Sequence, residues 1–341
     1  MKKTSLIAAL TSAAICFAAC APKQPEPEKA SFFAMDTYMT ITAYGENAEA
    51  AIEKASEKIS ELESLWSVTD ENSEIYRLGH SGGDPVEVSR DTAELLELML
   101  DISASTEGAL DCTIYPVLTA WGFTTGEYKI PAEEELAELL SRTGYEKISI
   151  SGQTVTIPEN MQLDLGAAGK GRAGAIAADI LRENGVTSAL LDLGGNIQTI
   201  GTKPDGSDWK LGLRSPFDEG TFAVLEVSDC AVITSGGYER YFVGEDGETY
   251  WHIIDPDTGK PAGSGLASVT IVGTDGAVCD ALSTAVFVMG RDKAAELWRQ
   301  RDDFEMVLVT DEKNIIITEA LEKRFSISGA YGNSTVEVLR R

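Results

Sequence analysis

Histidine and cysteine are scarce in this chain, and their scarcity limits its metal chemistry. Only 2 histidines occur in 341 residues, which excludes a metal site built on three imidazoles. Of the 5 cysteines, Cys16 and Cys20 lie near the N-terminus, while Cys112, Cys230 and Cys279 show no Cys-x-x-Cys spacing. Three thiols cannot all pair. We therefore expect small buried side chains rather than a disulfide scaffold or a zinc site.

Basic residues are also few. The chain carries 28 Lys and Arg against 55 Asp and Glu, a formal net charge of −27. Such a charge repels nucleic acid, so we expect no nucleic-acid partner, and an anionic membrane surface is equally unfavourable. A phosphate-bearing ligand would need local positive charge from a side chain, a helix end or a divalent cation.

The N-terminus lacks an apolar run long enough to span a bilayer but has the pattern of a targeting signal. Lys2 and Lys3 precede the short apolar run 6–17. Small residues then lead to Cys20, and the segment Phe17-Ala18-Ala19-Cys20 resembles a bacterial lipobox, in which the signal is cut before a cysteine that then carries lipid. An ordinary signal peptide or a retained membrane anchor is the alternative.

This pattern predicts three segments. We expect a signal peptide over residues 1–19, a lipidated Cys20 opening a Pro-rich tether over residues 20–30, and one catalytic unit over residues 31–341. The protein would then be a cell-membrane lipoprotein on the extracytoplasmic side, either the periplasmic face of an inner membrane or the outer leaflet of a Gram-positive membrane.

One stretch has the composition of an anion-binding turn. Apolar residues flank Asp164, small residues follow through Gly171, and an Ala/Ile/Leu run at helical spacing begins at once. Strand, tight turn and helix N-terminus in this order present free amides to an anion, and Lys170 adds a full positive charge. The spacing matches neither a Walker A loop nor a dinucleotide-binding fingerprint, and a simple packing turn is the other interpretation.

The remaining pattern predicts an α+β fold. Residues 32–44 are typical of a first strand, and Ala48–Trp66 carries an apolar stripe typical of an amphipathic helix on a sheet. Ser89 is the expected N-cap of a second helix, a further helix is expected to start at Asp280, and residues 306–318 form an expected hairpin. Strands and helices mix without regular βαβ alternation, so mixed or antiparallel sheets flanked by helices are expected, rather than a doubly wound sheet.

Four segments together resemble the ApbE family, the FAD:protein FMN transferases. They are Met35-Asp36-Thr37, the run from Asp164 to Gly171, Leu193-Gly194-Gly195-Asn196, and the run Thr234–Tyr241 continuing through His252–Pro261 to Asp280–Thr284. The likeness covers about Phe32 to Ala320. It implies a T-fold-related, two-lobed catalytic unit that moves FMN from FAD to a Ser or Thr hydroxyl of an exported target protein and releases AMP.

The resemblance also implies the site. It places FAD, the substrate, against Met35, Ala109, Leu110, Asp111, Asp164, Lys170 and Ile254. It implies Mg²⁺ held by Asp280, Thr284 and the backbone oxygen of Ala167. Asp280 and Thr284 are four residues apart, so on a helix both oxygens lie on one face, although such a pair also serves as a simple helix cap.

His252 is the only histidine in these motifs, and it is a candidate base for the acceptor hydroxyl alongside Lys170 as the phosphate partner. Positioning of the loop around it is the other interpretation. Two positions depart from the family pattern: Asp36 replaces a common Gly, and Thr69 stands where an aromatic residue commonly stacks on flavin.

The residues leave two alternatives to a transferase. An Mg²⁺-dependent FAD pyrophosphatase would use the same metal site with water in place of the acceptor hydroxyl, and a non-catalytic lipoprotein would only bind FAD. The expected site residues do not decide between these three activities, because the identity of the acceptor is not contained in this sequence.

Overall fold

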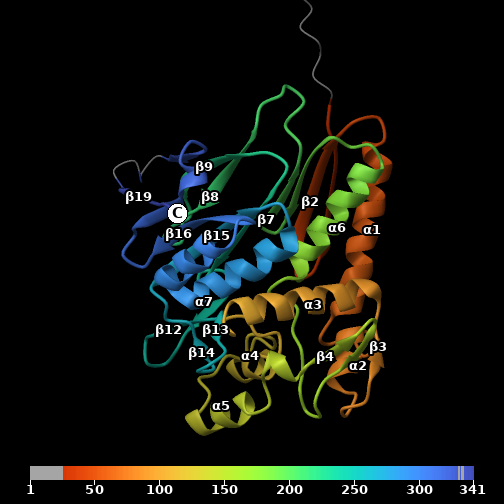
Figure 1. The fold of residues 1–341 in the computed structure, drawn as a ribbon, viewed down its shortest axis with the longest axis vertical. Helices are drawn as coiled ribbons and strands as arrows, with labels where there is room; N and C mark the ends of the chain where they lie inside the picture. The colour runs from red at the N-terminus through yellow and green to blue at the C-terminus, as the bar shows by residue number, and fades with distance from the viewer. Residues whose placement is uncertain (1–25, 329–330, 332–333) are drawn as a thin grey trace, which may run out of the picture.

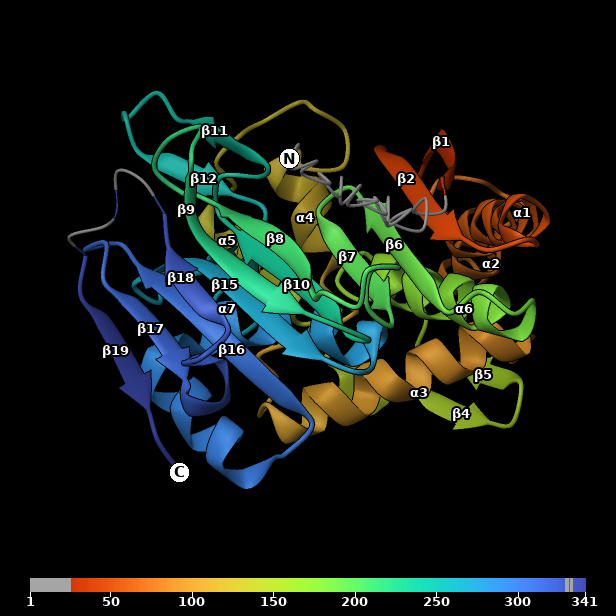
Figure 2. The same cartoon turned by 90° about the horizontal axis from the view of Figure 1, so that it is seen from above.

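The computed structural model describes residues 26–328, 331 and 334–341, so Cys20 and the expected signal peptide lie outside the described residues. A nine-stranded sheet with the order β1-β2-β6-β7-β10-β15-β16-β17-β19 forms the centre (Figures 1 and 2). Neighbouring strands in this sheet are antiparallel, except β17 and β19, which are parallel. Its strands are β1 (Glu28–Ala34), β2 (Thr37–Tyr44), β6 (Ser188–Leu193), β7 (Asn196–Ile200), β10 (Ala231–Gly236), β15 (Leu266–Gly273), β16 (Phe304–Thr310), β17 (Ile315–Thr318) and β19 (Val336–Leu339).

The first expected strand is wrong in one respect, because residues 32–44 form a hairpin rather than a single strand. Met35 and Asp36 adopt positive φ angles of 49° and 60°, the left-handed pair of a tight two-residue turn. Asp tolerates that conformation but Met rarely adopts it, so the sequence does not show the turn and Met35 carries its backbone strain.

Helices cover one face of the large sheet (Figure 2). They are α1 (Ala48–Trp66), α3 (Arg90–Ser105), α6 (Gly169–Glu183) and α7 (Gly276–Gln300). The bounds of α1 and the Ser89 cap of α3 are confirmed: the Ser89 side chain accepts from the amide of Thr92. The apolar stripe of α1 is buried against the sheet together with residues of α6 and α7, and this forms the main core.

Helix α7 begins earlier than its sequence suggests. Asp275 caps it by accepting hydrogen bonds from the amides of Ala277 and Val278 at 2.8 and 3.2 Å. Asp280 therefore lies in the second turn, and the expectation of a helix start at Asp280 is wrong. The local cap outcompetes the later start because an Asp side chain satisfies two of the free amides of the first turn.

A second layer covers the opposite face of the large sheet. The antiparallel strands β8 (Trp209–Arg214), β9 (Thr221–Val227) and β18 (Phe325–Ile327) form a separate sheet. Their buried side chains pack on Val232, Val272, Val307 and Ile317 of the large sheet, which gives a second core. The expected α+β architecture, with mixed or antiparallel sheets flanked by helices, is therefore confirmed.

A lower lobe lies below α3 in Figure 1. Its elements are α2 (Glu74–Gly79), α4 (Tyr115–Trp121), α5 (Glu133–Leu140), the short turn η1 (Tyr145–Lys147), the sheet of β3 (Val86–Glu87), β4 (Ser149–Ser151) and β5 (Thr154–Thr156), and the two-stranded pairs β11 (Tyr241–Val243) with β12 (Thr249–Trp251) and β13 (Ile254–Asp255) with β14 (Lys260–Pro261). A third apolar cluster around Trp121, Phe123 and Ile254 holds α4 and α5 to β13.

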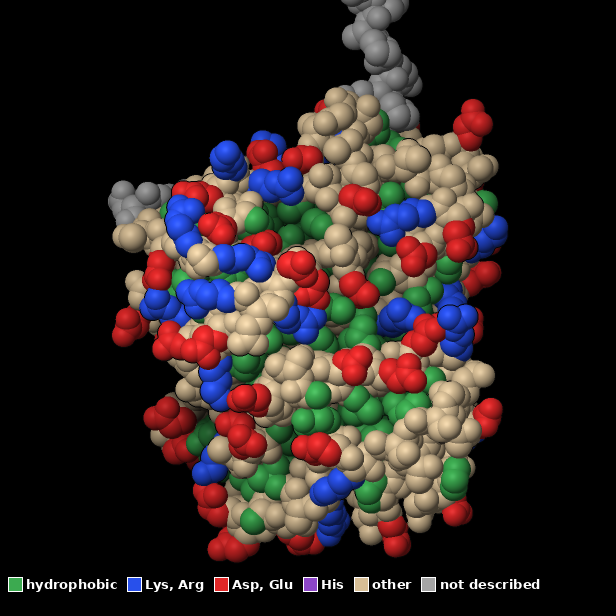
Figure 3. Space-filling model, viewed as in Figure 1, with side chains coloured by type: hydrophobic (Ala, Val, Ile, Leu, Met, Phe, Trp, Pro, Cys, Tyr) green, Lys and Arg blue, Asp and Glu red, His purple; other side chains and the backbone are tan. Residues whose placement is uncertain are grey.

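Acidic side chains are spread over the face viewed in Figure 3, with Lys and Arg interspersed mainly over its upper half. This distribution agrees with the net charge of −27. Among the described residues, no helix has both the length and the apolar character that crossing a bilayer requires.

Candidate active site

Two helices cross closely at Gly171, and this contact organises the site. A Cβ atom at Gly171 would lie 2.1 Å from the carbonyl oxygen of Gly276 and 2.5 Å from the Cβ of Asp280. Only glycine permits that approach. The start of α6 is therefore pressed against the first turns of α7, which brings the segment Asp164–Gly171 to Asp280.

The side chain of Asp280 is buried at this crossing. Its Oδ2 accepts a hydrogen bond of 2.7 Å from the amide of Gly171, and only 5% of the residue is exposed. Burial raises the pKa of Asp280, and Lys170, the Gly171 amide and Asn196 oppose that rise. Asp280 forms no ion pair among the residues that the structure describes, so a buried carboxylate is left without a bonded cation.

A backbone carbonyl beside it is also free. The carbonyl of Ala167 would ordinarily accept from the amide four residues later, but that amide belongs to Gly171 and is donated to Asp280. No other group in the described part of the chain donates to the Ala167 carbonyl. One oxygen acceptor thus remains open next to the buried carboxylate.

Two further polar groups face the same region. Thr284 lies one turn after Asp280 on α7, and its hydroxyl is 3.4 Å from that of Ser235. Asn196 is buried, and its side-chain nitrogen has no hydrogen-bond partner within 3.5 Å among the described residues, although it lies near enough to Asp280 to lower the pKa of that carboxyl. The oxygen atoms of Asp280, Ala167 and Thr284 fit Mg²⁺, which favours oxygen ligands and retains water, whereas the Asn196 nitrogen is a hydrogen-bond donor that suits a phosphate or water oxygen.

The candidate metal ligands are of different chemical types. No cluster of three or more His, Cys, Asp and Glu side chains that could hold a metal occurs in the described residues. The expected ligands, Ala167, Asp280 and Thr284, include only one carboxylate. A divalent ion there would depend on substrate phosphates to complete its coordination, as Mg²⁺ sites commonly do.

Lys170 and Arg240 supply the positive charge of the site. Lys170 acts electrostatically on Asp164, Asp280 and His252, while Arg240 acts on Asp164 and His252. Neither side chain forms an ion pair with a carboxylate of the described residues. Two cations without bonded partners suit a diphosphate. The sequence analysis assigned no role to Arg240; its one signal was a basic residue three positions after Gly237 in the Thr234–Tyr241 motif.

Asp164 lies between these cations. Its Oδ1 accepts a 2.6 Å hydrogen bond from the amide of Gly166, and its own amide donates to the carbonyl of Cys112 at 2.7 Å. Burial raises the pKa of Asp164, and the Gly166 amide, Lys170 and Arg240 act in the opposite direction. The residue is half-buried.

Asp111 has a different environment, because the protein itself satisfies its carboxylate. Oδ1 accepts from the amide and hydroxyl of Thr113 at 2.8 and 2.6 Å, and Oδ2 accepts from the amide of Tyr145 at 3.2 Å. Thr113 in turn accepts from Gly144. Asp111 therefore joins two loops of the lower lobe, and the neighbouring residues Ala109 and Leu110 are held beside Asp164 by the Cys112 contact.

His252 is neutral and has a defined tautomer. Its Nδ1 lies 3.2 Å from the carbonyl of Arg240, and a carbonyl can only accept, so Nδ1 carries the proton. The lone pair is then on Nε2. Burial lowers the pKa of His252 to about 4, and the charge of Arg240 adds to that effect. A neutral imidazole with a free Nε2 can accept a proton at neutral pH.

The Met35–Asp36 turn approaches the same region through the sheet. The amide of Met35 donates to Glu63 of α1 at 2.6 Å. Thr37 packs so tightly on the turn between β6 and β7 that a Cβ at Gly194 would lie 2.1 Å from its hydroxyl. That turn ends in Asn196, the neighbour of Asp280, and Asp280 accepts from Gly171, so all four motif segments meet here.

Ile254 and Thr69 lie less directly in the site. Only 6% of Ile254 is exposed, because its side chain packs in the third apolar cluster, and its backbone lies in the β13–β14 pair. Thr69 is an exposed residue in the turn after α1, where its amide and hydroxyl contact Ser67.

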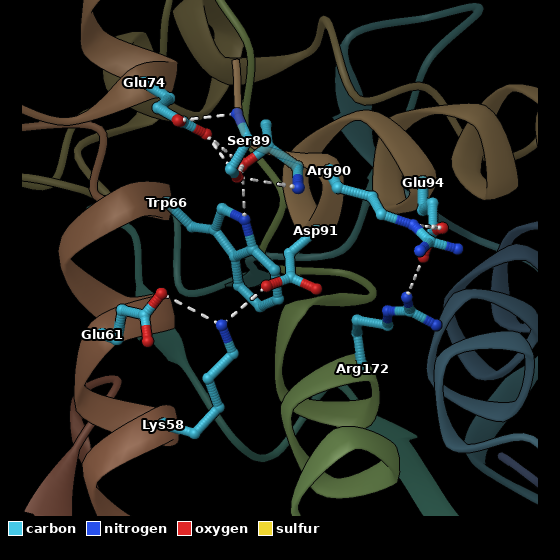
Figure 4. Close-up of polar contacts among 10 residues, drawn as sticks. Lys58, Glu61, Trp66, Glu74, Ser89, Arg90, Asp91, Glu94 and Arg172 are labelled. Atoms are coloured by element: carbon cyan, nitrogen blue, oxygen red, sulfur yellow. Dashed lines mark hydrogen bonds and ion pairs between the residues drawn. The ribbon is translucent and has the colours of Figure 1, made fainter. Parts of the chain in front are cut away.

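A polar network fixes the helices that carry the site (Figure 4). Arg172, two residues after Lys170, pairs with Glu94 of α3 at 2.6 Å, and Arg90 pairs with the other oxygen of Glu94. Lys58 of α1 pairs with Asp91 at 2.7 Å. Helix α3 is therefore tied both to α1 and to the start of α6, which holds the Lys170 turn in place.

Comparison with known proteins shows which family shares this sequence and fold. Residues 35–308 match the model of the ApbE family. The FAD:protein FMN transferase of Klebsiella pneumoniae is 31% identical over 284 residues, which cover 82% of this chain and 88% of that protein. The FAD:protein FMN transferase of Treponema pallidum is 32% identical over 300 residues, with 82% and 83% coverage.

Solved structures agree. The ApbE protein of Thermotoga maritima is similar with a TM-score of 0.82 and 31% identity, covering 88% of this chain and 99% of that one. The flavin transferase ApbE of Vibrio cholerae is similar with a TM-score of 0.76 and 25% identity, covering 91% and 100%.

Proposed function

Because the chain belongs to the ApbE family and is an FAD:protein FMN transferase, we propose that it works with Mg²⁺ and modifies a Ser or Thr hydroxyl of an exported protein. The observation that carries the metal proposal is the buried Asp280 carboxylate, which lacks a bonded cation and lies beside the free carbonyl of Ala167. With Thr284 on the same helix, these groups would hold the ion. Bound there, Mg²⁺ would neutralise charge on the FAD diphosphate.

The FAD-binding residues are proposed on the same basis. Lys170 and Arg240 would pair with the diphosphate, because both cations lack bonded carboxylates. Asp164 keeps open acceptor capacity for a ribose, ribityl or adenine donor. Ala109, Leu110 and the backbone of Ile254 would line the bound molecule beside Met35, while Asp111 would act by holding their loop.

The reaction exchanges one phosphate linkage for another. The acceptor hydroxyl oxygen attacks the phosphorus of the FMN half, the bond to the AMP phosphate oxygen breaks, and AMP leaves with the electron pair. The hydroxyl proton moves to Nε2 of His252 or to solvent. His252 supports base catalysis through its neutral state and loop positioning through its bond to Arg240, and both roles follow from one hydrogen bond.

The cellular location is proposed from the N-terminal pattern. Lipidation of Cys20 would hold the enzyme at the extracytoplasmic face of the membrane, where an exported acceptor with a motif such as Asp-x-x-Ser/Thr-Gly-Ala-Ser/Thr would meet it.

The test is an assay with purified enzyme, FAD, Mg²⁺ and an acceptor domain carrying that motif. We expect flavin that survives denaturation of the acceptor, a phosphoester at the Ser or Thr, and AMP in equal amount; Asp280→Ala should form these products more slowly, on the order of 100-fold or more. Release of free FMN and AMP with no modified acceptor would identify a pyrophosphatase, and intact FAD would identify a binding protein.

A further inference from the structure

Strand β11 has an edge with unpaired peptide groups. It pairs only with β12, in the register Tyr241↔Trp251, Phe242↔Tyr250 and Val243↔Thr249. The flanking bonds from His252 to Arg240 and from Gly244 to Glu248 mark the hydrogen-bonded pairs. In an antiparallel ladder these alternate with non-bonded pairs. The amides and carbonyls of Tyr241 and Val243 therefore point away from β12, and no described backbone group pairs with them.

The edge is accessible and held firmly. Tyr241 is 52% exposed and Val243 61% exposed. Phe242, between them, points to the other face and stacks on Tyr128 and Tyr250 with ring centroids 4.9 and 5.3 Å apart. The hairpin is thus anchored by one face while its outer edge stays open, and Figure 2 shows β11 at the outside of the molecule.

This edge leads directly into the active site. Arg240 immediately precedes β11, and its carbonyl accepts hydrogen bonds from the amide and Nδ1 of His252 at 3.1 and 3.2 Å. A chain lying along β11 would therefore pass from the exposed tip of the hairpin towards the one neutral imidazole and a cation of the site. Among molecules that this enzyme must bind, only the acceptor is a polypeptide.

We propose that the acceptor segment carrying the modified hydroxyl binds as an extended strand along the outer edge of β11. Backbone donors and acceptors spaced two residues apart match an extended peptide and no other substrate of this reaction. Main-chain pairing explains how one enzyme could hold a flexible segment while contacting few of its side chains. The inference rests on the proposed transfer to a protein hydroxyl.

A pair of proline variants tests the edge. Val243→Pro removes one outward amide but no bond to β12, and proline is tolerated at such edge positions. Thr249→Pro makes the same change on β12, where the amide of residue 249 points away from β11. We expect Val243→Pro to raise the KM for an acceptor peptide about tenfold, the effect of about one hydrogen bond, with FAD affinity unchanged. Thr249→Pro should transfer FMN like wild type.

A second measurement needs no variant of the enzyme. Synthetic acceptor peptides carrying Asp-x-x-Ser/Thr-Gly-Ala-Ser/Thr are methylated on one backbone nitrogen at a time. Strand pairing predicts that KM alternates between high and low along the flanking residues, with a period of two. Equal effects at successive positions, or a larger loss with Thr249→Pro than with Val243→Pro, would overturn the proposal.

The outcomes separate this inference from the proposed function. A wild-type enzyme that modifies no acceptor refutes the transfer itself. An enzyme that modifies acceptors with the same KM after Val243→Pro retains the function and refutes the β11 edge. Conversion of a dimer to a monomer by Val243→Pro, with acceptor KM unchanged, would assign the edge to a second copy of this chain and would also overturn the proposal.

Discussion

At the scale of single residues, the amide of Gly171 determines the character of the site. By donating to Asp280 it leaves the Ala167 carbonyl free, and because glycine has no Cβ it lets α6 and α7 approach. The same hydrogen bond stabilises the charged form of a carboxylate that burial disfavours. Substitution of Gly171 or Asp280 should therefore lower the rate of FMN transfer more than it lowers the free energy of unfolding.

Asp280→Ala should lower the rate of FMN transfer on the order of 100-fold or more, while FAD affinity falls much less. The carboxylate acts on charge that develops in the transition state, whereas many other contacts hold FAD. Asp280→Asn is the matched variant, because it keeps an oxygen for the Gly171 amide and removes the charge. Transfer at wild-type rate by Asp280→Ala at ordinary Mg²⁺ concentration would remove Asp280 from the site.

His252 makes stability depend on pH in a defined window. Its pKa falls from 6.5 to about 4 on folding, so between these values the unfolded chain binds more protons. Stability should therefore be full above pH 6.5 and decline as pH falls towards 4. The full decline is about 3.5 kcal/mol, since one pKa unit corresponds to about 1.4 kcal/mol.

Urea unfolding of wild type and His252→Gln at a series of pH values measures this contribution. The decline between pH 6.5 and 4 should be shallower in His252→Gln. His80→Gln, which changes the other of the 2 histidines, is the control. Parallel curves for wild type and His252→Gln would show that His252 is not held neutral by the fold.

At the scale of elements, helix bounds and caps that depend on local sequence could be predicted, whereas elements that depend on long-range packing could not. The α1 bounds and the Ser89 cap followed from side-chain periodicity and cap chemistry, which are local. The hairpin at Met35–Asp36 could not be predicted, because its left-handed turn lacks Asn and Gly and is held by Glu63 from α1. The start of α7 was missed because the Asp275 cap stands before a weakly periodic sequence.

The α6–α7 crossing can be tested by adding one methyl group. Gly171→Ala would place Cβ 2.1 Å from the Gly276 carbonyl, so the helices must separate, and we expect a loss of about 1–3 kcal/mol in unfolding free energy with a large loss of transfer. Gly174→Ala on the same helix is the control. Its Cβ would lie 3.6 Å from Leu193, an ordinary contact, so stability should hold or rise.

Chemical denaturation measures the stability of both glycine variants, and transfer assays measure their activity. A Gly171→Ala enzyme that keeps wild-type stability and activity would show that the crossing can relax without moving Asp280.

At the scale of the whole molecule, the site is assembled from segments far apart in the chain. The motif segments predicted FAD chemistry, but their meeting at Asp280 depends on the order of β2, β6 and β7 in the large sheet. Arg240 had no assigned role because its relation to His252 and Asp164 arises only when β11 pairs with β12 and the base of this hairpin lies near Asp164. A net charge of −27 makes these two cations the more important, since the overall field repels the diphosphate.

The last prediction concerns where the whole molecule resides. Strand β1 begins at Glu28, so only a short Pro-containing segment separates Cys20 from the folded unit, and lipid on Cys20 would hold the enzyme close to the membrane surface. Cys20→Ala should block processing or move the protein from the membrane fraction to the soluble fraction, with transfer by the folded unit retained in vitro. Fractionation and mass spectrometry of the mature N-terminus measure this, and Cys16→Ala is the matched control. A Cys20→Ala protein that is cleaved normally and stays equally membrane-bound would show that a different N-terminal feature anchors the enzyme.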